Sequence, residues 1–439
     1  MAIISQINFF NYETDLEDYG DLERLLMLLE ITQDEELIRA LEDKRGLCGR
    51  NDYPVEVMWN TFIAGLVFQH QSVASLLREL SRNAQLRWLV SGGQMTSRNI
   101  PTASAMSRFE KSLIEFQGLI DDIFINLQHD LSKLLPEFGQ RLALDSKIIE
   151  SHSPRKSSGK RSDRRGEHDA EWGVKEYKGK KEDGSIWSTK KSFFGFKLHL
   201  LVDSQYELPL AYVLTTANQA DNVIAMDVME KFGQDTPEFL EPAKFLSADR
   251  GYDDQKLVEY LAEKEITAVI DTREKWKEDE KPLLDLDNVT YTEKGKVYCC
   301  CPVTAKRRKM RNGGYEKSRD CVRVQCAVKC REGLVCAGAA QCACSKGLRI
   351  PRRTDPRAFQ RLPRASYKWQ REYKKRTSVE RVNSRLDVSF GFENHTIRGK
   401  RKMQLRCSLA LIVMLGVACA HLTHNAKSES YRSLVKRVA

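Results

Sequence analysis

The chain has 439 residues, enough for two or three domains of ordinary size. Hydrophobic residues make up 41% of it and charged residues 30%, so it can bury a core and still present a heavily charged surface. Its net charge of +10, from 71 Lys and Arg against 61 Asp and Glu, favours an anionic partner, and nucleic acid is the commonest one. A soluble protein that is merely basic is the alternative.

Two features argue against a membrane. The first residues contain no basic segment followed by a long apolar stretch, so we expect no signal peptide. The longest apolar run, residues 407–420, is shorter than the roughly 20 residues that a helix needs to cross a ~30 Å hydrocarbon core. We therefore expect a buried helix there, no membrane partner, and a cytoplasmic, nucleoid-associated protein of a prokaryote.

Residues 1–135 carry apolar side chains at helical spacing, in segments such as LERLLMLLEIT and VEVMWNTFIAGLVFQ. Ser72 and Thr102 stand where helix N-caps are expected. We predict an all-helical amino-terminal domain, residues 1–135, that either binds DNA or mediates dimerisation.

From residue 140 the apolar period becomes that of strands. Strands are expected in RLALDSKII, over residues 193–203 and 208–216, and in the short segments KFLSAD and ITAVID, while the basic stretch 152–169 is predicted to be a loop. Three antiparallel-type strands followed by strand, helix and strand is the order of an RNase H-like core. The predicted fold class is therefore α/β, with an RNase H-like mixed sheet flanked by helices, built from residues 136–271 and 372–425.

Residues 272–371 interrupt this order and are predicted to be a basic, cysteine-rich insertion. Nine of the 12 cysteines lie in one cluster, which favours metal ligands over disulfides when no secretion signal is present. Their spacing matches paired thiolate ligands only loosely, so reduced thiols without a metal are the alternative. The predicted ligands of a structural Zn²⁺ are Cys299, Cys301, Cys326 and Cys330. The basic residues predicted to contact the DNA backbone beside them, unless they form a solvated charge run, are Lys306, Arg307 and Arg308.

A late helix is predicted over the segment YKKRTSVERVNSRLDVSF. At 100° per residue, one face of this helix carries Tyr373, Arg376, Glu380 and Asp387 within about 60° of one another. A separate apolar stripe lies about 120–180° away, so the helix can pack by one face and offer an aromatic, a cation and a carboxylate on another. The alternative is an exposed face on which Arg376 and Glu380 form a favourable i,i+4 pair.

Two aspartates occupy costly positions. Asp145 interrupts an apolar strand, and Asp249 ends another just before a glycine turn. A carboxylate there is unfavourable unless it lies exposed at the sheet edge or binds a metal. If the two strands are neighbours, two Mg²⁺ ions roughly 3.5–4 Å apart would relieve the repulsion and support in-line phosphoryl transfer, and Mn²⁺ could substitute. Asp253 and Asp254, which follow closely, are instead predicted to be helix N-caps.

In order along the chain, the segments LALDSKI, FGFKLHLLVD, LPLAYVLTTANQAD, LSADRGYDD and YKKRTSVERVNSRLD resemble those of the DDE transposases of bacterial insertion sequences. The branch they resemble is the one with the YREK signature. The helices around IPTASAMSRF are similar to the amino-terminal domain of that family, so the likeness spans nearly the whole chain.

The resemblance implies that the catalytic metal ligands are Asp145, Asp249 and Glu380. It also implies that Tyr373 and Arg376 contact DNA phosphates near the cut, a task for which the planar guanidinium fork is suited. The signature places Lys where this chain has Asp387, and a carboxylate repels phosphate. Either Arg385 takes over that contact or binding of the transposon end is weakened.

The predicted function is therefore metal-dependent cleavage at transposon ends and strand transfer into target DNA by phosphoryl transfer. The expected partners are double-stranded DNA, as terminal inverted repeats and target, and a second copy of the chain in a homodimer. The alternatives are a catalytically inactive, transposase-derived DNA-binding protein and a related nuclease. No Gly-rich loop followed by Lys and Ser or Thr is present, so no ATP site is expected.

Overall fold

The computed structural model of the protein describes residues 21–45, 53–154, 166–180, 186–273, 276–326, 328 and 336–424. The central part of the predicted loop 152–169, and the predicted zinc ligand Cys330, lie outside these residues.

The amino-terminal region is helical, as predicted. The side-chain oxygens of Ser72 and Thr102 accept backbone N–H bonds from Ser75 and Ala105, so both residues are N-caps. The helices are α1 (Asp21–Ile31), α2 (Glu35–Arg45), α3 (Val55–Val67), α4 (Val73–Arg82), α5 (Ala84–Ser91), α6 (Ala103–Glu115) and α7 (Gln117–Leu134).

A six-stranded mixed sheet follows. Its strands are β1 (Arg141–Glu150), β2 (Glu171–Lys180), β3 (Ile186–Asp203), β4 (Leu208–Thr216), β5 (Phe245–Ala248) and β6 (Thr267–Ile270). The order is β2-β3-β1-β5-β6, with β4 also paired to β3. Strand β3 is antiparallel to β1, β2 and β4, whereas β1, β5 and β6 are mutually parallel. This arrangement, with its flanking helices, is the predicted RNase H-like fold.

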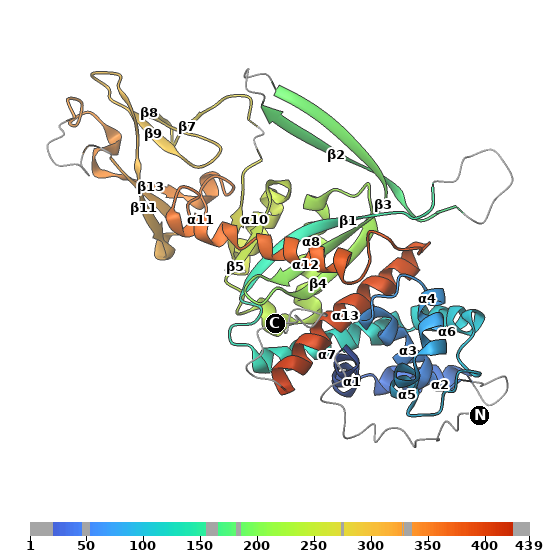
Figure 1. Ribbon diagram of the computed structural model, residues 1–439. Helices are drawn as coiled ribbons and strands as arrows, with labels where there is room; N and C mark the ends of the chain where they lie inside the picture. The colour runs from blue at the N-terminus through green and yellow to red at the C-terminus, as the bar shows by residue number, and fades with distance from the viewer. Residues whose placement is uncertain are drawn as a thin grey trace, which may run out of the picture.

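Helices cover both faces of the sheet (Figure 1). They are α8 (Asp221–Asp235), α9 (Pro237–Leu240), α10 (Gln255–Glu263), α11 (Tyr367–Lys374), α12 (Thr377–Val388) and α13 (Lys400–His424). Lys147 of β1 pairs with Asp387 of α12, whereas Lys197, on the opposite face of the sheet, pairs with Asp221 of α8. Helix α12 therefore packs on the face of β1 that carries Asp145, because Asp145 and Lys147 alternate to the same side.

The predicted buried helix is α13, which is long and apolar enough to cross a membrane but lies within the protein core. It packs against α7, α1, α3 and α6 of the helical region and against β4 of the sheet. One continuous hydrophobic cluster therefore joins the amino-terminal helices to the sheet.

The cysteine-rich segment forms two small antiparallel sheets with a hydrophobic core of their own. One sheet contains β7 (Lys281–Leu283), β8 (Leu286–Tyr291), β9 (Val297–Cys300) and β10 (Arg307–Lys309). The other contains β11 (Arg311–Glu316), β12 (Cys321–Gln325) and β13 (Leu348–Pro351). In Figure 1 this segment stands at the opposite side of the sheet from the amino-terminal helices.

One element was not predicted. Strand β2 and the first half of β3, residues 171–180 and 186–195, form a two-stranded ribbon that leaves the body of the sheet (Figure 1). At the base of this β2–β3 ribbon, a Cβ atom on Gly195 would lie 2.1 Å from the carbonyl oxygen of Ile149, and one on Gly173 would lie 2.5 Å from that of Ala217. The close approach of the strands thus requires glycine at both positions.

We expect Gly195→Ala to lower the free energy of unfolding by about 1–3 kcal/mol, because the added methyl group overlaps the backbone of β1. A matched control is Gly118→Ala in α7, where a Cβ meets no atom within 4 Å. That change should stabilise the protein by up to about 1 kcal/mol, the difference in helix propensity. Urea unfolding of both variants measures the effect, and equal stabilities would contradict the proposed overlap.

Candidate functional site

Asp145 and Asp249 are brought together by strand pairing. Strands β1 and β5 are parallel neighbours whose register ends at Leu144 opposite Ala248. The next residue on each strand is the predicted aspartate, so the two carboxylates lie side by side at the carboxyl edge of the sheet. Both side chains are partly buried.

The pKa of Asp145 is raised to about 6, mainly by burial and in smaller part by the negative charge of Asp249. Arg376 and Lys175 oppose this effect and lower the pKa of Asp145. The site therefore tolerates two ionised carboxylates poorly, which is the condition that a bound cation relieves.

Asp249 is fixed by the turn that follows it. Its Oδ1 atom accepts a 2.7 Å hydrogen bond from the backbone N–H of Gly251, as the cap of a short 3₁₀ turn, Arg250–Tyr252. A Cβ atom on Gly251 would lie 2.8 Å from the same oxygen, so the turn closes tightly over the carboxylate. The glycine turn thus fixes the orientation of the Asp249 side chain.

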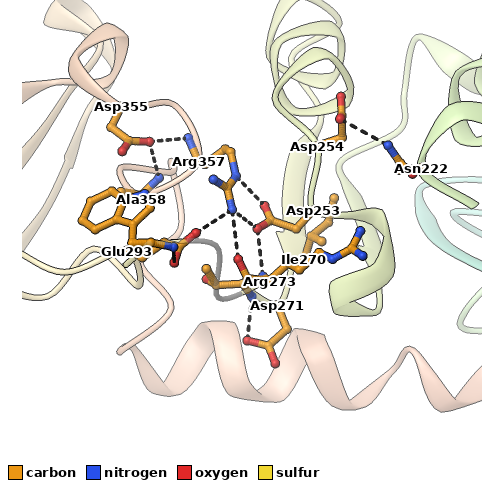
Figure 2. Close-up of polar contacts among 12 residues, drawn as sticks. Asn222, Asp253, Asp254, Ile270, Asp271, Arg273, Glu293, Asp355, Arg357 and Ala358 are labelled. Atoms are coloured by element: carbon orange, nitrogen blue, oxygen red, sulfur yellow. Dashed lines mark hydrogen bonds and ion pairs between the residues drawn. The ribbon is translucent and has the colours of Figure 1, made fainter. Parts of the chain in front are cut away.

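The far end of this turn is anchored by the cysteine-rich segment (Figure 2). Asp253 is fully buried and accepts hydrogen bonds from the guanidinium of Arg357, whose Nε lies 3.2 Å from Oδ1, and from the N–H of Arg273. Arg357 also donates to Glu293 at 3.0 Å. The prediction that Asp253 caps a helix is therefore wrong, whereas Asp254 does cap α10.

The predicted late helix is broken into α11 and α12 at Lys375 and Arg376. Tyr373 lies in the last turn of α11 and stacks on Trp369, with ring centroids 4.6 Å apart. Burial raises the pKa of Tyr373, and the charges of Asp271 and Asp249 raise it as well. The break keeps Tyr373 beside the carboxylate edge of the sheet.

Glu380 is not in direct contact with the two aspartates. Its carboxylate accepts from Arg376, with Nη1 2.7 Å from Oε1, and its side chain is 49% exposed. The i,i+4 pair that was the alternative interpretation of this helix face is therefore present. Arg376, the partner of Glu380, also lies close enough to Asp145 for each to shift the pKa of the other.

Asp387, which departs from the signature, is paired with Lys147 of β1. The Lys147 side chain is only 8% exposed, so its ammonium group depends on this partner. The unexpected carboxylate on α12 thus balances a buried cation two residues from Asp145.

The predicted DNA-binding residues differ in their ion-pair partners and in their exposure. Arg385 binds the buried Glu207 in the turn before β4 and donates to its carbonyl oxygen at 2.8 Å. Arg307 pairs with Glu280, and Arg308 is partly buried. Lys306 is exposed.

Of the predicted zinc ligands that the structure describes, Cys299 and Cys301 contact different cysteines. Cys299 contacts Cys344, whose Sγ is 2.8 Å from that of Cys342, whereas Cys301 lies 3.9 Å from Cys336. The reason is local, because Cys301 begins a turn after β9 while Cys299 faces the core of the segment. Within the described ranges, no group of three or more His, Cys, Asp or Glu side chains is able to hold a metal ion. Cys330 lies outside the described residues, so the predicted zinc set stays a prediction.

The sequence interpretation missed Asp271. Strands β5 and β6 are parallel and their register ends at Ala248 opposite Ile270, so Asp271 follows β6 as Asp249 follows β5. Figure 2 shows Asp271 at this edge, and its Oδ1 accepts from the N–H of Thr272 at 2.8 Å. The signal was available, because a carboxylate directly after a buried strand is the same pattern that identified Asp249.

An RNase H-like sheet with adjacent carboxylates at the ends of parallel strands defines the class of enzymes that transfer phosphoryl groups with the help of divalent metals. Residues 136–415 match the family model described as the transposase DDE domain, and residues 15–112 match a model described as a transposase domain (DUF772). The first match covers more than half of the chain, so the protein belongs to the DDE transposase family. The family implies phosphoryl-transfer chemistry on DNA and a divalent metal.

No curated protein matches the chain significantly. Among solved structures, the chain is similar to the piggyBac transposase in the cryo-EM structure of its synaptic complex with hairpin DNA. The identity is 14% and the TM-score 0.38, with 95% of this chain and 78% of that chain covered. A likeness this loose assigns no residue.

The described residues fit a divalent metal in part. Asp145 and Asp249 supply adjacent carboxylate oxygens, the donors that Mg²⁺ prefers, and their mutual repulsion favours a cation. Glu380 can serve as a further ligand only when it leaves Arg376.

We expect Asp145→Asn to stabilise the protein in a pH-dependent way. The folded-state pKa of Asp145, about 6, exceeds the usual value near 3.9, so wild-type stability falls as pH rises from about 4 to about 6. The amide side chain of the variant does not ionise, so the variant does not lose stability over this pH range. The difference in melting temperature between variant and wild type should be small at about pH 4 and larger at about pH 7, and a constant difference would contradict the assignment.

Asp387→Asn should destabilise the protein by about 3–5 kcal/mol, because it leaves the buried Lys147 ammonium unpaired. The double variant Lys147→Met with Asp387→Leu should recover most of this loss, since it removes both charges. Urea unfolding of Asp387→Asn measures the loss, and that of the single variants Lys147→Met and Asp387→Leu and of the double variant measures the coupling. Additive effects would show that the two residues do not interact.

Proposed function

We propose that this protein is the transposase of an insertion sequence, which cuts DNA at the ends of its element and joins those ends to target DNA. The observation that carries the proposal is the parallel register of β1 and β5, which sets Asp145 and Asp249 next to each other at the edge of the RNase H-like sheet. The match to the DDE domain over residues 136–415 supports the same chemistry.

The third carboxylate of the proposed site is Glu380. Helix α12 faces β1, since Asp387 pairs with Lys147 and Arg376 acts on Asp145. Glu380 lies between these two contacts along the same helix face. It can join the aspartates by a side-chain rotation once Arg376 moves to another anion, and a DNA phosphate is the anion proposed here.

When bound, Mg²⁺ or Mn²⁺ would help to activate the attacking oxygen and to stabilise the leaving one. The protein's contribution is to hold carboxylate oxygens of Asp145, Asp249 and Glu380 at one edge, and to orient the scissile phosphate through the fork of Arg376 and the hydroxyl of Tyr373. In each step one P–O bond breaks as another forms, first with water and then with the freed 3′ hydroxyl as nucleophile. One carboxylate site can therefore serve both steps.

We assign the protein to the YREK branch on the spacing of Tyr373, Arg376 and Glu380. The missing lysine of the signature is replaced by a paired Lys147 and Asp387, which together carry no net charge. Such a pair does not repel a phosphate as an isolated carboxylate would, so the departure does not argue for an inactive protein.

The proposed domains are the helical region 1–135, the catalytic domain 136–271 with 372–425, and the insertion 272–371. The proposed partners are the terminal inverted repeats and target DNA in duplex form, together with a second copy of the chain, because two element ends must be processed together. The proposed location is the nucleoid of a prokaryotic cytoplasm. Of the three basic residues of the insertion predicted to contact DNA, Arg307 is paired with Glu280 and Arg308 is partly buried, so the exposed Lys306 is the proposed backbone contact.

We expect Asp145→Asn, Asp249→Asn and Glu380→Gln each to abolish Mg²⁺-dependent cleavage of a plasmid that carries the gene with its native flanking DNA. Duplex binding should be retained, because each change removes a metal ligand rather than a cation. Strand-cleavage and filter-binding assays measure the two activities. The matched controls are the exposed residues Asp227→Asn and Glu393→Gln, which should cleave as wild type does.

Cleavage by any of the three site variants at the wild-type rate would refute the site. A wild-type protein that binds the flanking DNA and does not cut it with Mg²⁺ or Mn²⁺ would support the alternative, an inactive transposase-derived DNA-binding protein. Cutting without joining of ends would support a related nuclease.

A further inference from the structure

The function proposed above does not use the β2–β3 ribbon. The ribbon exposes large apolar side chains, which are unfavourable in contact with water. Its described part carries Trp172, Val174 and Trp187 with exposed fractions of 47%, 65% and 40%. A two-stranded ribbon that leaves its sheet gains little stability from packing, so exposed aromatic groups there point to a binding partner.

The charge pattern on one face of the ribbon identifies the chemistry of that partner. Lys175 of β2 lies directly opposite Lys191 of β3. Directly opposed residues of an antiparallel pair have Cβ atoms about 4.5–5.5 Å apart, and like charges at that spacing are destabilising. Both lysines are exposed, and in the part of the chain that the structure describes neither is paired with a carboxylate. An anion lying across the pair would remove the repulsion.

The same face continues toward the ribbon tip with groups suited to nucleic acid. In the register of β2 and β3, Thr189 and Trp187 follow Lys191 at alternate positions and therefore point to the same side. A hydroxyl and an exposed indole beside two ammonium groups match the backbone and the sugar or base surface of DNA.

The opposite face of the ribbon differs and offers a control. Trp172 there packs against Phe194, with ring centroids 5.4 Å apart, and Lys190 lies opposite Glu176 rather than opposite another cation. Among the opposed pairs of the ribbon whose side chains the structure describes, two cations face each other at Lys175 and Lys191, whereas Lys190 faces a carboxylate.

The ribbon also lies within electrostatic reach of the candidate catalytic site. Strand β1 continues past Asp145 to Glu150, which lies opposite Gly195 at the base of the ribbon, so the ribbon leaves the sheet on the same side as the carboxylates of Asp145 and Asp249. A polyanion that runs along the ribbon face would therefore pass close to the carboxylate edge of the sheet.

We propose that the β2–β3 ribbon is a DNA-binding arm that holds the phosphate backbone next to the scissile phosphate through Lys175 and Lys191. This inference rests on the proposed function and adds to it a surface outside the carboxylate site. The occupant is duplex DNA rather than a protein, because the described part of the face combines two cations without a carboxylate partner with a hydroxyl and an indole, and its acidic residue, Glu171, lies at the base of the ribbon opposite Gly195.

The test is the salt dependence of duplex binding by the full chain. Lys175→Gln and Lys191→Gln should each reduce the slope of log affinity against log salt by about 0.9, the value for one lost phosphate contact. Lys190→Gln removes the same charge from the other face and should leave the slope unchanged. Each variant of the opposed pair should melt at or above the wild-type temperature, because it relieves a repulsion.

Cleavage kinetics separate binding from catalysis. The Lys175→Gln and Lys191→Gln variants should need more DNA to reach half-maximal rate, while the rate at saturating DNA stays near that of wild type. The proposal that the ribbon binds DNA would be overturned if both variants kept the wild-type salt dependence of binding, or if Lys190→Gln reduced it equally. It would also be overturned if the variants changed the oligomeric state without a change in DNA binding. If the wild-type chain binds and cuts DNA, such results defeat only this inference, whereas a wild-type chain that does not bind duplex DNA defeats the proposed function as well.

Discussion

A helix that is apolar on every side must be covered on every side, and α13 imposes this constraint on the whole fold. The amino-terminal helices and β4 supply the cover, so neither region can bury its apolar surface without the other. Two sets of contacts determine how α13 packs against its neighbours. Gly416 lets Leu28 of α1 approach so closely that a Cβ atom would lie 2.2 Å from its Cδ1. Ser408, fully buried, bonds Tyr212 of β4 at 2.7 Å and Gln117 of α7 at 2.8 Å. The helical region therefore supports the sheet through the packing of α13 against β4.

The opposite edge of the sheet, where the aspartates lie, is held by the cysteine-rich segment instead. Asp253 ends the turn that begins at Asp249, and its burial is possible because Arg357 neutralises it (Figure 2). Arg364 adds a bond to the carbonyl oxygen of Ile270, the last residue of β6. The insertion thus braces the ends of the two strands, β5 and β6, that carry carboxylates to the edge. The cysteine-rich segment has its own hydrophobic core and is in direct contact with the turn after Asp249 and with the end of β6.

The sequence predicted the strand-end aspartates because the cost of a carboxylate in an apolar strand is a local property, visible without any fold. It predicted the order of β1, β3, β4, β5 and β6 along the chain for the same reason, since period and turns are local. Pairings between distant residues were not visible: nothing near Asp253 indicates Arg357, and nothing near Asp387 indicates Lys147. Strand β2 was missed because its sequence, EWGVKEYKGK, has too few apolar residues to show the alternation of a half-buried strand. A ribbon whose described side chains are mostly exposed beyond its base produces no such signal.

Charge balance connects these elements at the candidate site. Burial already raises the pKa of Asp145 to about 6 in the presence of Asp249, so a third ionised carboxylate at the same place would be costly without a cation. Arg376 keeps Glu380 apart by pairing with it. In the proposed mechanism a DNA phosphate takes Arg376, Glu380 is released, and the aspartates gain a third oxygen ligand for the metal. Metal affinity and DNA binding are then linked through Arg376. Its guanidinium pairs with Glu380 in the absence of DNA and releases Glu380 to the metal when it binds a phosphate. The resting protein consequently avoids assembling a strongly negative site before the substrate that requires it is bound.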